Sequence, residues 1–541
     1  MLKLLLPFIL LSGLCFSQAD SKNKTALNPA DAAKIAVGKQ KMYAGDYVAA
    51  LNAFREVEKN NTDNGPVNFY LGYCYFYLKQ MANASSSLEK AVNASNVVPE
   101  SFFYLGRVYQ AEQKFDLAIS RLETYVSQPK ADKFELEEAR IVLSQCRNAK
   151  QFMAAPLDVL VINLGADVNS KWDDKNPCIT ADGARLVFTT RRPETTNAPV
   201  DVEGDNKYFE DIYLAQRDSA TQNFGKAMPV SANINVKGHD AVTGISADGK
   251  QIFIYYNTAT GNGRGGNLFA SKVADGKWKT PEDLGKPINS SYWEGGVCLS
   301  PDGKKYFFTS ERKGGFGLSD IWMVEKKGKN EWGKPENLGP EINSANDEGG
   351  VFLAPDGKTL FFCSNGPSSM GGYDVFRSNY ENGQWSKPEN LGFPVNTPAH
   401  EGQMTISADA RYAYISSNRE GGLGESDLYK IDLKNYAILE KDGKRKNASG
   451  LGILRGTIRE GSEGYGVQDV EVVVKSETDQ IVASTATGET GEYFLTLPAG
   501  SYKLEIRKNG YTTITDTFEL PLNTKETPKV EKGYLFKKTP Q

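Results

Sequence analysis

Five acidic residues recur at one position of a long internal repeat. A turn aspartate recurs as Asp182, Asp248, Asp302, Asp356 and Asp409, about every 54 residues in its later copies. Eight residues before each turn aspartate stands an acid: Asp174, Asp240, Glu294, Glu348 and Glu401. We call these five side chains the ring acids. Carboxylates contributed by every repeat could surround a channel mouth and bind a cation or a basic segment of a partner protein.

The ring acids have a second interpretation, which we favour. Loops with Arg191, Arg312 and Arg419 lie at the same end of the repeat, so each acid can pair with an arginine or accept backbone N–H bonds. A glycosidase would instead need two carboxylates in different environments, whereas these acids are equivalent between repeats.

Motifs for other chemistry are absent from the sequence. No GxSxG elbow, phosphate loop or HExxH motif occurs, and the only two histidines, His239 and His400, directly precede ring acids. We therefore predict no catalytic, cofactor-binding or metal-binding residues and no cofactor.

The strands that must position the ring acids follow a fixed order in each repeat. A short apolar strand precedes the Asp-Gly turn, a second follows it, a third comes after a Gly-rich loop, and Trp278, Trp332 and Trp385 mark a fourth. The strand 157–164 matches the fourth position, and the last repeat has only three strands. We therefore predict a five-bladed β-propeller over residues 155–440, closed without a free sheet edge. The repeats resemble the TolB-like or PD40 class of WD40-like propellers.

A helical repeat precedes this region. Gly38, Gly72 and Gly106 are 34 residues apart, as are Ala50, Ala84 and Ala118. This spacing resembles the tetratricopeptide repeat, in which small residues let two antiparallel helices approach closely. We predict an all-α solenoid over residues 28–153 that ends with a helix from 133 to 152.

The C-terminal region is predicted to be a small β-sandwich. A polar linker, residues 441–450, leads into short strands joined by Gly turns over residues 451–541. Segments such as Gly466-Val467-Gln468-Asp469 and Pro498-Ala499-Gly500 resemble the carboxypeptidase regulatory-like domain, which implies a transthyretin-like fold.

Composition and the first residues bear on location. The net charge of −4 provides no basic field for nucleic acid. Lys3, the apolar run 4–16 and Ser17 are typical of a signal peptide, residues 1–18, and we expect export. Because Leu14 precedes Cys15, we expect cleavage near Ser17 without lipidation.

The five later cysteines have no metal-ligand spacing, so we expect them to be buried apolar residues.

The order of the three regions is itself informative. Behind an export signal it resembles the PorE-type envelope proteins associated with the Bacteroidetes type nine secretion system. The resemblance implies a non-enzymatic scaffold in the periplasm or at the outer membrane, peripheral to the membrane, whose partners are other envelope proteins. Those proteins continue into an OmpA-like peptidoglycan-binding domain that this sequence does not show after Lys538, so we expect no peptidoglycan contact of that kind. The alternative is an envelope propeller that binds or cleaves glycans.

Overall fold

The structure is a computed structural model. It describes residues 27–541 except 129–132, 196–197, 203–204, 237, 258–264, 275, 329–330, 440–449, 462–463, 523–526 and 540–541. The predicted signal peptide and most of the predicted linker lie outside the described residues.

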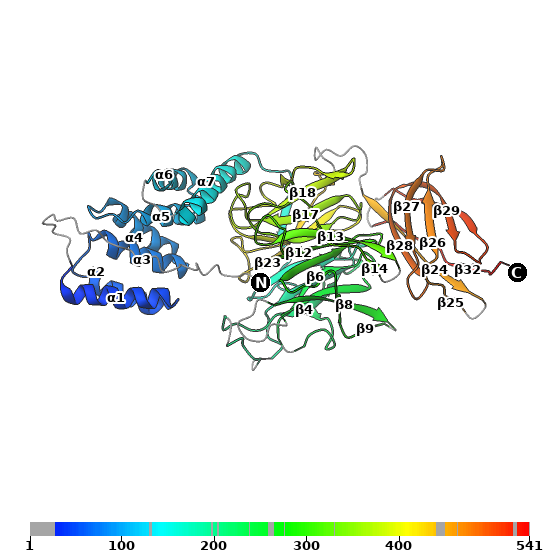
Figure 1. Ribbon diagram of the computed structural model, residues 1–541, viewed down its shortest axis with the longest axis horizontal. Coiled ribbons are helices and arrows are strands. Elements are labelled where there is room, and N and C mark those ends of the chain that lie inside the picture. The colour runs from blue at the N-terminus through cyan, green and yellow to red at the C-terminus, as the bar shows by residue number, and fades with distance from the viewer. Residues whose placement is uncertain are drawn as a thin grey trace. The chain divides into compact units, whose positions relative to one another are not determined.

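The described residues of the N-terminal region form seven helices (Figure 1). They are α1 (Pro29–Tyr43), α2 (Tyr47–Glu58), α3 (Gly65–Tyr77), α4 (Met81–Asn93), α5 (Glu100–Ala111), α6 (Phe115–Val126) and α7 (Lys133–Ala154). The side chains of Asn28, Asp46 and Asn64 accept backbone N–H bonds at the starts of α1, α2 and α3. These tetratricopeptide-like helices confirm the helical pattern read from the sequence.

The repeated glycines mark the closest approach of paired helices. A Cβ atom on Gly38 would lie 2.4 Å from Phe54, and one on Gly72 would lie 2.4 Å from Leu88. The third copy, Gly106, faces Leu122 in the same way, at 2.6 Å. The repeat of 34 residues therefore reflects one packing contact made three times.

The chain divides into two compact units. The first contains α1 to α5 and the second half of α6, and the other contains the first half of α6 and everything from α7 onward.

Twenty-three short strands follow α7 and build a succession of small, propeller-like antiparallel sheets. The first two repeats and the strand before them contain β1 (Leu160–Asn163), β2 (Asp174–Ile179), β3 (Arg185–Thr190), β4 (Asp211–Gln216), β5 (Met228–Pro229), β6 (Asp240–Ile245), β7 (Gln251–Tyr256), β8 (Asn267–Ala274), β9 (Lys277–Trp278) and β10 (Glu282–Asp283). The later repeats contain β11 (Glu294–Leu299), β12 (Lys305–Ser310), β13 (Asp320–Gly328), β14 (Glu331–Trp332), β15 (Glu336–Asn337), β16 (Glu348–Leu353), β17 (Thr359–Ser364), β18 (Asp374–Glu381), β19 (Gln384–Trp385), β20 (Glu389–Asn390), β21 (Glu401–Ile406), β22 (Tyr412–Ser417) and β23 (Asp427–Asp432).

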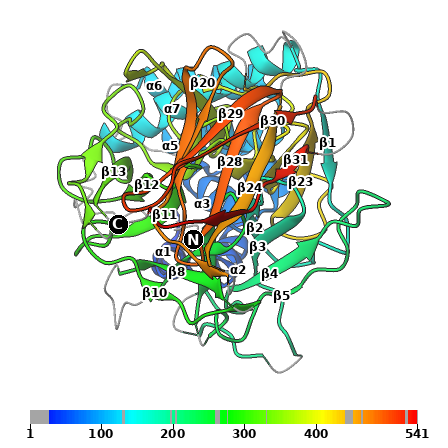
Figure 2. The same cartoon turned by 90° about the vertical axis from the view of Figure 1, so that its right-hand side faces the viewer.

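Each ring acid opens the first strand of its sheet. Figure 2 shows β2, β3, β4 and β5 side by side in chain order, and the other repeats follow the same plan. The first strands also contact one another in sequence, from β2 through β6, β11 and β16 to β21, and β21 contacts β2.

Strand β1 joins the last sheet of this region. It pairs antiparallel with β23, with Leu160 opposite Asp432 and Asn163 opposite Tyr429. The sheet order is therefore β1-β23-β22-β21, so a strand from the start of the region completes the sheet at its end. The sequence predicted this pairing from the missing fourth strand of the last repeat.

The turns between first and second strands adopt the same left-handed conformation. Gly183, Gly249, Gly303 and Gly357 have φ between +68° and +71°. Glycine adopts this conformation without steric cost. In the fifth copy Ala410 occupies the position at φ +50°, so the turn keeps the left-handed conformation although alanine adopts it less readily.

The C-terminal region is a β domain with its own core. Its strands are β24 (Leu451–Glu460), β25 (Tyr465–Gly466), β26 (Glu471–Lys475), β27 (Ile481–Ala486), β28 (Glu492–Pro498), β29 (Gly500–Arg507), β30 (Ile514–Leu520), β31 (Lys529–Glu531) and β32 (Tyr534–Phe536). Two sheets enclose an apolar cluster that includes Leu454, Val472 and Phe518. The strands β31 and β32 pair parallel to β24.

Candidate functional site

The ring acids are buried at the starts of β2, β6, β11, β16 and β21. Their exposed fractions are only 0% to 1%. Each accepts a hydrogen bond from the backbone N–H of the residue four positions earlier, and in four repeats that residue is a serine or threonine whose hydroxyl also donates. The donors are Ser170, Val236, Ser290, Ser344 and Thr397. Every ring acid therefore holds the loop before its own strand.

An arginine reaches the ring acid in three of the five repeats. The ion pairs are Arg192 with Asp174 at 2.8 Å, Arg312 with Glu294 at 3.2 Å, and Arg419 with Glu401 at 3.2 Å. Arg312 and Arg419 also donate to two backbone carbonyls each, so these guanidinium groups tie the acid to a neighbouring loop. The structure brings each pair together within one repeat.

The arginine assigned to the first repeat was wrong by one residue. Arg192, rather than Arg191, is the counterpart of Arg312 and Arg419, because it stands two residues after the last residue of the second strand, Thr190. Arg191 instead pairs with Asp205 at 2.8 Å and approaches Glu210 at 3.6 Å.

Two repeats have no arginine beside the ring acid, and burial raises the pKa of their acids. At the arginine position, Gly366 stands in the fourth repeat and Thr258, outside the described residues, in the second. Burial raises the pKa of Asp240 to about 7 and that of Glu348 to about 7. The hydroxyl groups of Ser344 and Ser364 oppose this shift at Glu348 without cancelling it. Burial also raises the pKa of Asp174 and of Glu401, where the paired arginine opposes the shift.

Glu210 is the centre of a buried charged cluster in the first repeat. Its carboxylate lies 2.5 Å from Lys175 Nζ and 3.3 Å from His239 Nδ1, and its side chain is 1% exposed. Burial alone would raise the pKa of Glu210, but Lys175 and His239 hold it well below the usual value. The sequence analysis missed this residue, although an acid between Phe209 and a strand was a signal of a paired buried charge.

The two histidines share a repeat position but not an environment. His239 lies between Glu210 and Asp201, whose Oδ2 is 3.2 Å from His239 Nε2. Burial opposes protonation of His239, but the two carboxylates raise its pKa above the ordinary value. His400 accepts a hydrogen bond from the backbone N–H of Tyr373, and burial lowers its pKa to about 4.

The Asp-Gly turns at the opposite end of the strands contact the C-terminal β domain. Thr527 Oγ1 donates to Asp409 Oδ2 at 3.0 Å, and Leu451 N–H donates to the Ala408 carbonyl at 2.7 Å. Ile453 packs in a small apolar cluster with Ala181 and Ala408. The turn end is therefore partly covered, whereas the ring-acid end carries the longer loops.

The helices of the first unit offer a different kind of surface. Tyr47, Tyr73, Tyr77 and Tyr104 pack together, with ring centroids 4.8 Å apart for both Tyr47–Tyr77 and Tyr73–Tyr104. Most of the aromatic stretch 69–77 thus packs between helices. A shallow pocket lies on α1, where Tyr43 is 59% exposed beside Ile35 and Lys39.

The remaining candidate chemistry is limited. Cys74, Cys146, Cys178, Cys298 and Cys363 are buried and unbonded to one another, as the sequence predicted. Burial raises the pKa of the Cys298 thiol to about 12. Within the described ranges, no His, Cys, Asp and Glu side chains group as metal ligands, and no helix is long and apolar enough to cross a membrane.

Comparison with known proteins identifies the C-terminal region. The family model of the carboxypeptidase regulatory-like domain matches residues 453–531. A search of curated proteins returned no match.

Solved structures resemble separate parts of the chain. The first TPR domain of human RPAP3 is 21% identical over 22% of this chain and 94% of its own, with a TM-score of 0.21. An α-L-arabinanase of Penicillium chrysogenum is 11% identical over 51% of this chain and 99% of its own, with a TM-score of 0.32. A sialidase of Trypanosoma rangeli is 10% identical over 69% of this chain and 93% of its own, with a TM-score of 0.29. The match to a family model is confined to the C-terminal β domain.

Proposed function

We propose that this protein is a non-enzymatic scaffold that joins other proteins at the cell envelope. The proposal combines a tetratricopeptide solenoid, a five-bladed propeller and a transthyretin-like sandwich, in the order that resembles PorE-type proteins of type nine secretion. Export, a periplasmic or outer-membrane location and a role in secretion or gliding machinery are parts of the same proposal.

The observation that carries the proposal is the local bonding of the ring acids. All five are buried and hold loops of their own repeats, and three are neutralised by arginine. A carboxylate used in this way shapes a rigid loop surface instead of meeting a substrate. Exposed apolar side chains on the loops that carry Arg312 and Arg419, such as Phe316, Leu318 and Leu423, suit contact with another protein.

Five-blade closure is the structural part of the proposal. The pairing of β1 with β23 and the contact between β2 and β21 support it. Deleting residues 157–163 should leave β23 as an unpaired edge and cause aggregation, measured by light scattering. A deletion variant that stays monomeric and melts like the wild type would contradict closure through β1.

Partner binding is tested by purification from the native envelope after crosslinking, with quantitative identification of the proteins recovered. We expect Tyr43→Ala on α1 to reduce recovery of at least one partner severalfold. Tyr380→Ala is the matched control, because Tyr380 is 41% exposed on β18 and lies outside the solenoid. Unchanged recovery in both variants would remove the solenoid from the proposal, and recovery of no envelope protein by the wild type would contradict the scaffold itself.

A second candidate function is glycan cleavage at the ring acids. The observation in its favour is that burial raises the pKa of Asp240 and of Glu348 to about 7, the range in which a carboxyl group can act as a general acid. Glycan hydrolysis by the wild type that disappears in Glu348→Gln would support this function over the scaffold. We expect no hydrolysis by either protein.

A further inference from the structure

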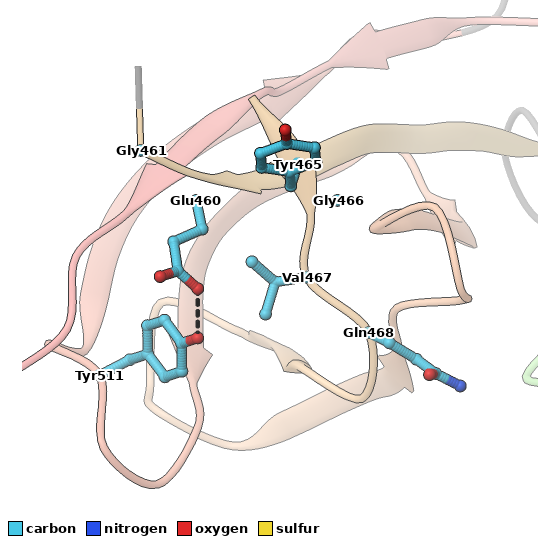
Figure 3. A pocket seen from close by; sticks show the side chains of 7 residues that line it. All are labelled: Glu460, Gly461, Tyr465, Gly466, Val467, Gln468 and Tyr511. Atoms are coloured by element: carbon cyan, nitrogen blue, oxygen red, sulfur yellow. Dashed lines mark hydrogen bonds between the residues drawn. The ribbon is translucent and has the colours of Figure 1, made fainter. Parts of the chain in front are cut away.

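A pocket on the C-terminal β domain has the composition of a ligand site (Figure 3). Glu460, Tyr465, Val467, Gln468 and Tyr511 line it, around a cavity of about 560 Å³. It lies where β24 ends and β25 begins. Tyr465 is 71% exposed, whereas Val467 at the base of the pocket is buried.

Glycines fix the backbone of this corner. Gly461 and Gly464 have φ of +68° and +75°, which glycine adopts without steric cost, and Glu460 at the end of β24 pairs antiparallel with Tyr465 of β25. A Cβ atom on Gly466 would lie 2.1 Å from the Thr490 carbonyl oxygen, which holds the residue after Tyr465 tightly against the domain. The position of the Tyr465 backbone is therefore set by its neighbours before any ligand arrives.

The polar wall of the pocket is also held in place. Tyr511 donates its hydroxyl to Glu460 Oε2 at 2.5 Å, and Lys538 Nζ lies 2.6 Å from Glu460 Oε1. The Tyr511 ring stacks on Phe536, with centroids 4.7 Å apart and an interplanar angle of 11°. Figure 3 shows the Glu460 carboxylate and the Tyr511 hydroxyl facing each other beside Val467. A carboxylate held in this way keeps lone pairs for further donors at little ordering cost.

The charges indicate which class of ligand fits. Lys538 balances Glu460, and Lys508 lies nearby with its ammonium on the Gln468 carbonyl. Lys508 and Lys538 would repel a cationic ligand. The carboxylate of Glu460, whose pKa is lowered by Lys538 and Tyr511, would repel an anionic ligand. An uncharged ligand with hydroxyl donors avoids both penalties.

We propose that this pocket binds a neutral saccharide. A pyranose has an apolar face of C–H groups and a rim of hydroxyls, which match the Tyr465 ring and the carboxylate oxygens of Glu460 respectively. The site would add glycan attachment to the β domain and does not depend on the scaffold proposal, which concerns protein partners of the helices and the propeller loops.

Saturation-transfer NMR on the full chain tests the proposal with maltoheptaose, cellopentaose and chitopentaose as separate probes. We expect transfer to the ring protons of at least one oligosaccharide by the wild type and by Tyr465→Phe. Tyr465→Ala should weaken the affinity about tenfold or more, and Tyr380→Ala, at an exposed tyrosine of the propeller-like region, should not change it.

Two outcomes would overturn it. One is the absence of transfer to every probe at millimolar concentration, and the other is equal transfer by the wild type and Tyr465→Ala. If Tyr465→Ala unfolds, Glu460→Gln takes its place, because the amide keeps the shape of the side chain while weakening the bonds that hydroxyl donors make. Unchanged affinity in a folded Glu460→Gln would then also count against a saccharide.

Discussion

The repeats share one backbone arrangement around the ring acid, but only three of the five place an arginine beside it. In the first, third and fifth repeats, guanidinium groups approach the acids to 2.8–3.2 Å. In the second, Asp240 accepts from the Val236 backbone N–H, and in the fourth, Glu348 accepts from the backbone and hydroxyl of Ser344. Burial raises the pKa of both acids to about 7. Sequence equivalence therefore fixes the position of a buried carboxylate, whereas its pKa depends on burial and on whether an arginine from a different loop opposes the effect of burial.

Removing an arginine should have the largest effect on this comparison. We expect Arg312→Ala to lower the free energy of unfolding by about 3 kcal/mol, because Glu294 would stay buried without its cation and two backbone carbonyls would lose a donor. The guanidinium also stacks on Phe308, at 4.7 Å from the ring centroid. Denaturation followed by tryptophan fluorescence measures the change, with exposed Lys313→Ala as the control. Equal free energies of unfolding for the two variants would mean that the ion pair of Arg312 with Glu294 does not stabilise the protein.

Adding an arginine to the fourth repeat should give Glu348 the ion pair that Glu294 makes in the third repeat. A Cβ atom on Gly366 would lie 3.1 Å from Asn346 Nδ2, a contact that a small side-chain shift relieves. In Gly366→Arg, the new cation should lower the pKa of Glu348 and stabilise the protein at pH 8 by on the order of 2 kcal/mol. At pH 5, where Glu348 is protonated without the arginine, the gain should be small.

The measurement for Gly366→Arg is the unfolding free energy across pH 5–8. In the wild type, the raised pKa of Glu348 means that stability falls as pH rises from the unfolded pKa toward about 7. The variant should show a flatter profile over this window. A loss of the same size at both pH values would indicate steric damage and contradict the pairing.

Glu348→Gln should have a smaller effect. At pH 5 the change replaces a protonated acid with an amide and leaves a loop donor from Ser344 without its acceptor, which should cost on the order of 1 kcal/mol. At pH 8 the cost should shrink, because the wild type then carries a buried charge that the variant lacks. The matched change Glu294→Gln should cost more at both pH values, since it leaves Arg312 without its carboxylate.

The histidine comparison predicts the smallest change. His239 gains stability from its raised pKa below the unfolded value of about 6.5, and this contribution is lost as pH rises through the higher folded pKa. His239→Gln should therefore destabilise the protein at pH 6 by less than about 1 kcal/mol and have less effect at pH 8.5. His400→Gln provides the opposite control, because the pKa of His400 is lowered to about 4 and its contribution disappears on acidification. Identical pH profiles for the two variants would contradict the role assigned to Asp201 and Glu210.

Much of the architecture was readable from spacing. The glycines at 34-residue intervals predicted the paired helices, and the Asp-Gly turns predicted the hairpins that follow each ring acid. The missing strand of the last repeat led to the pairing of β1 with β23. The predictions succeeded because each rests on a local rule that every copy of the repeat must obey, such as a left-handed turn or a close helix contact.

The candidate sites were less predictable. Counting along the loop placed Arg191 beside a ring acid, whereas the structure places Arg192 there and directs Arg191 toward Asp205. Consecutive residues of a loop can point in different directions, so spacing alone does not decide which one returns to the strand.

The sequence by itself therefore determined which residues recur, and with them the helices, the hairpins and the positions of the five acids, because steric and hydrogen-bonding rules act over a few neighbouring residues. Only the tertiary structure decided the charge state of those acids and the pairing of Glu210 with Lys175 and His239. Desolvation and Coulomb interactions depend on distances between segments that are remote in the chain, and those distances exist only after the sheets have packed.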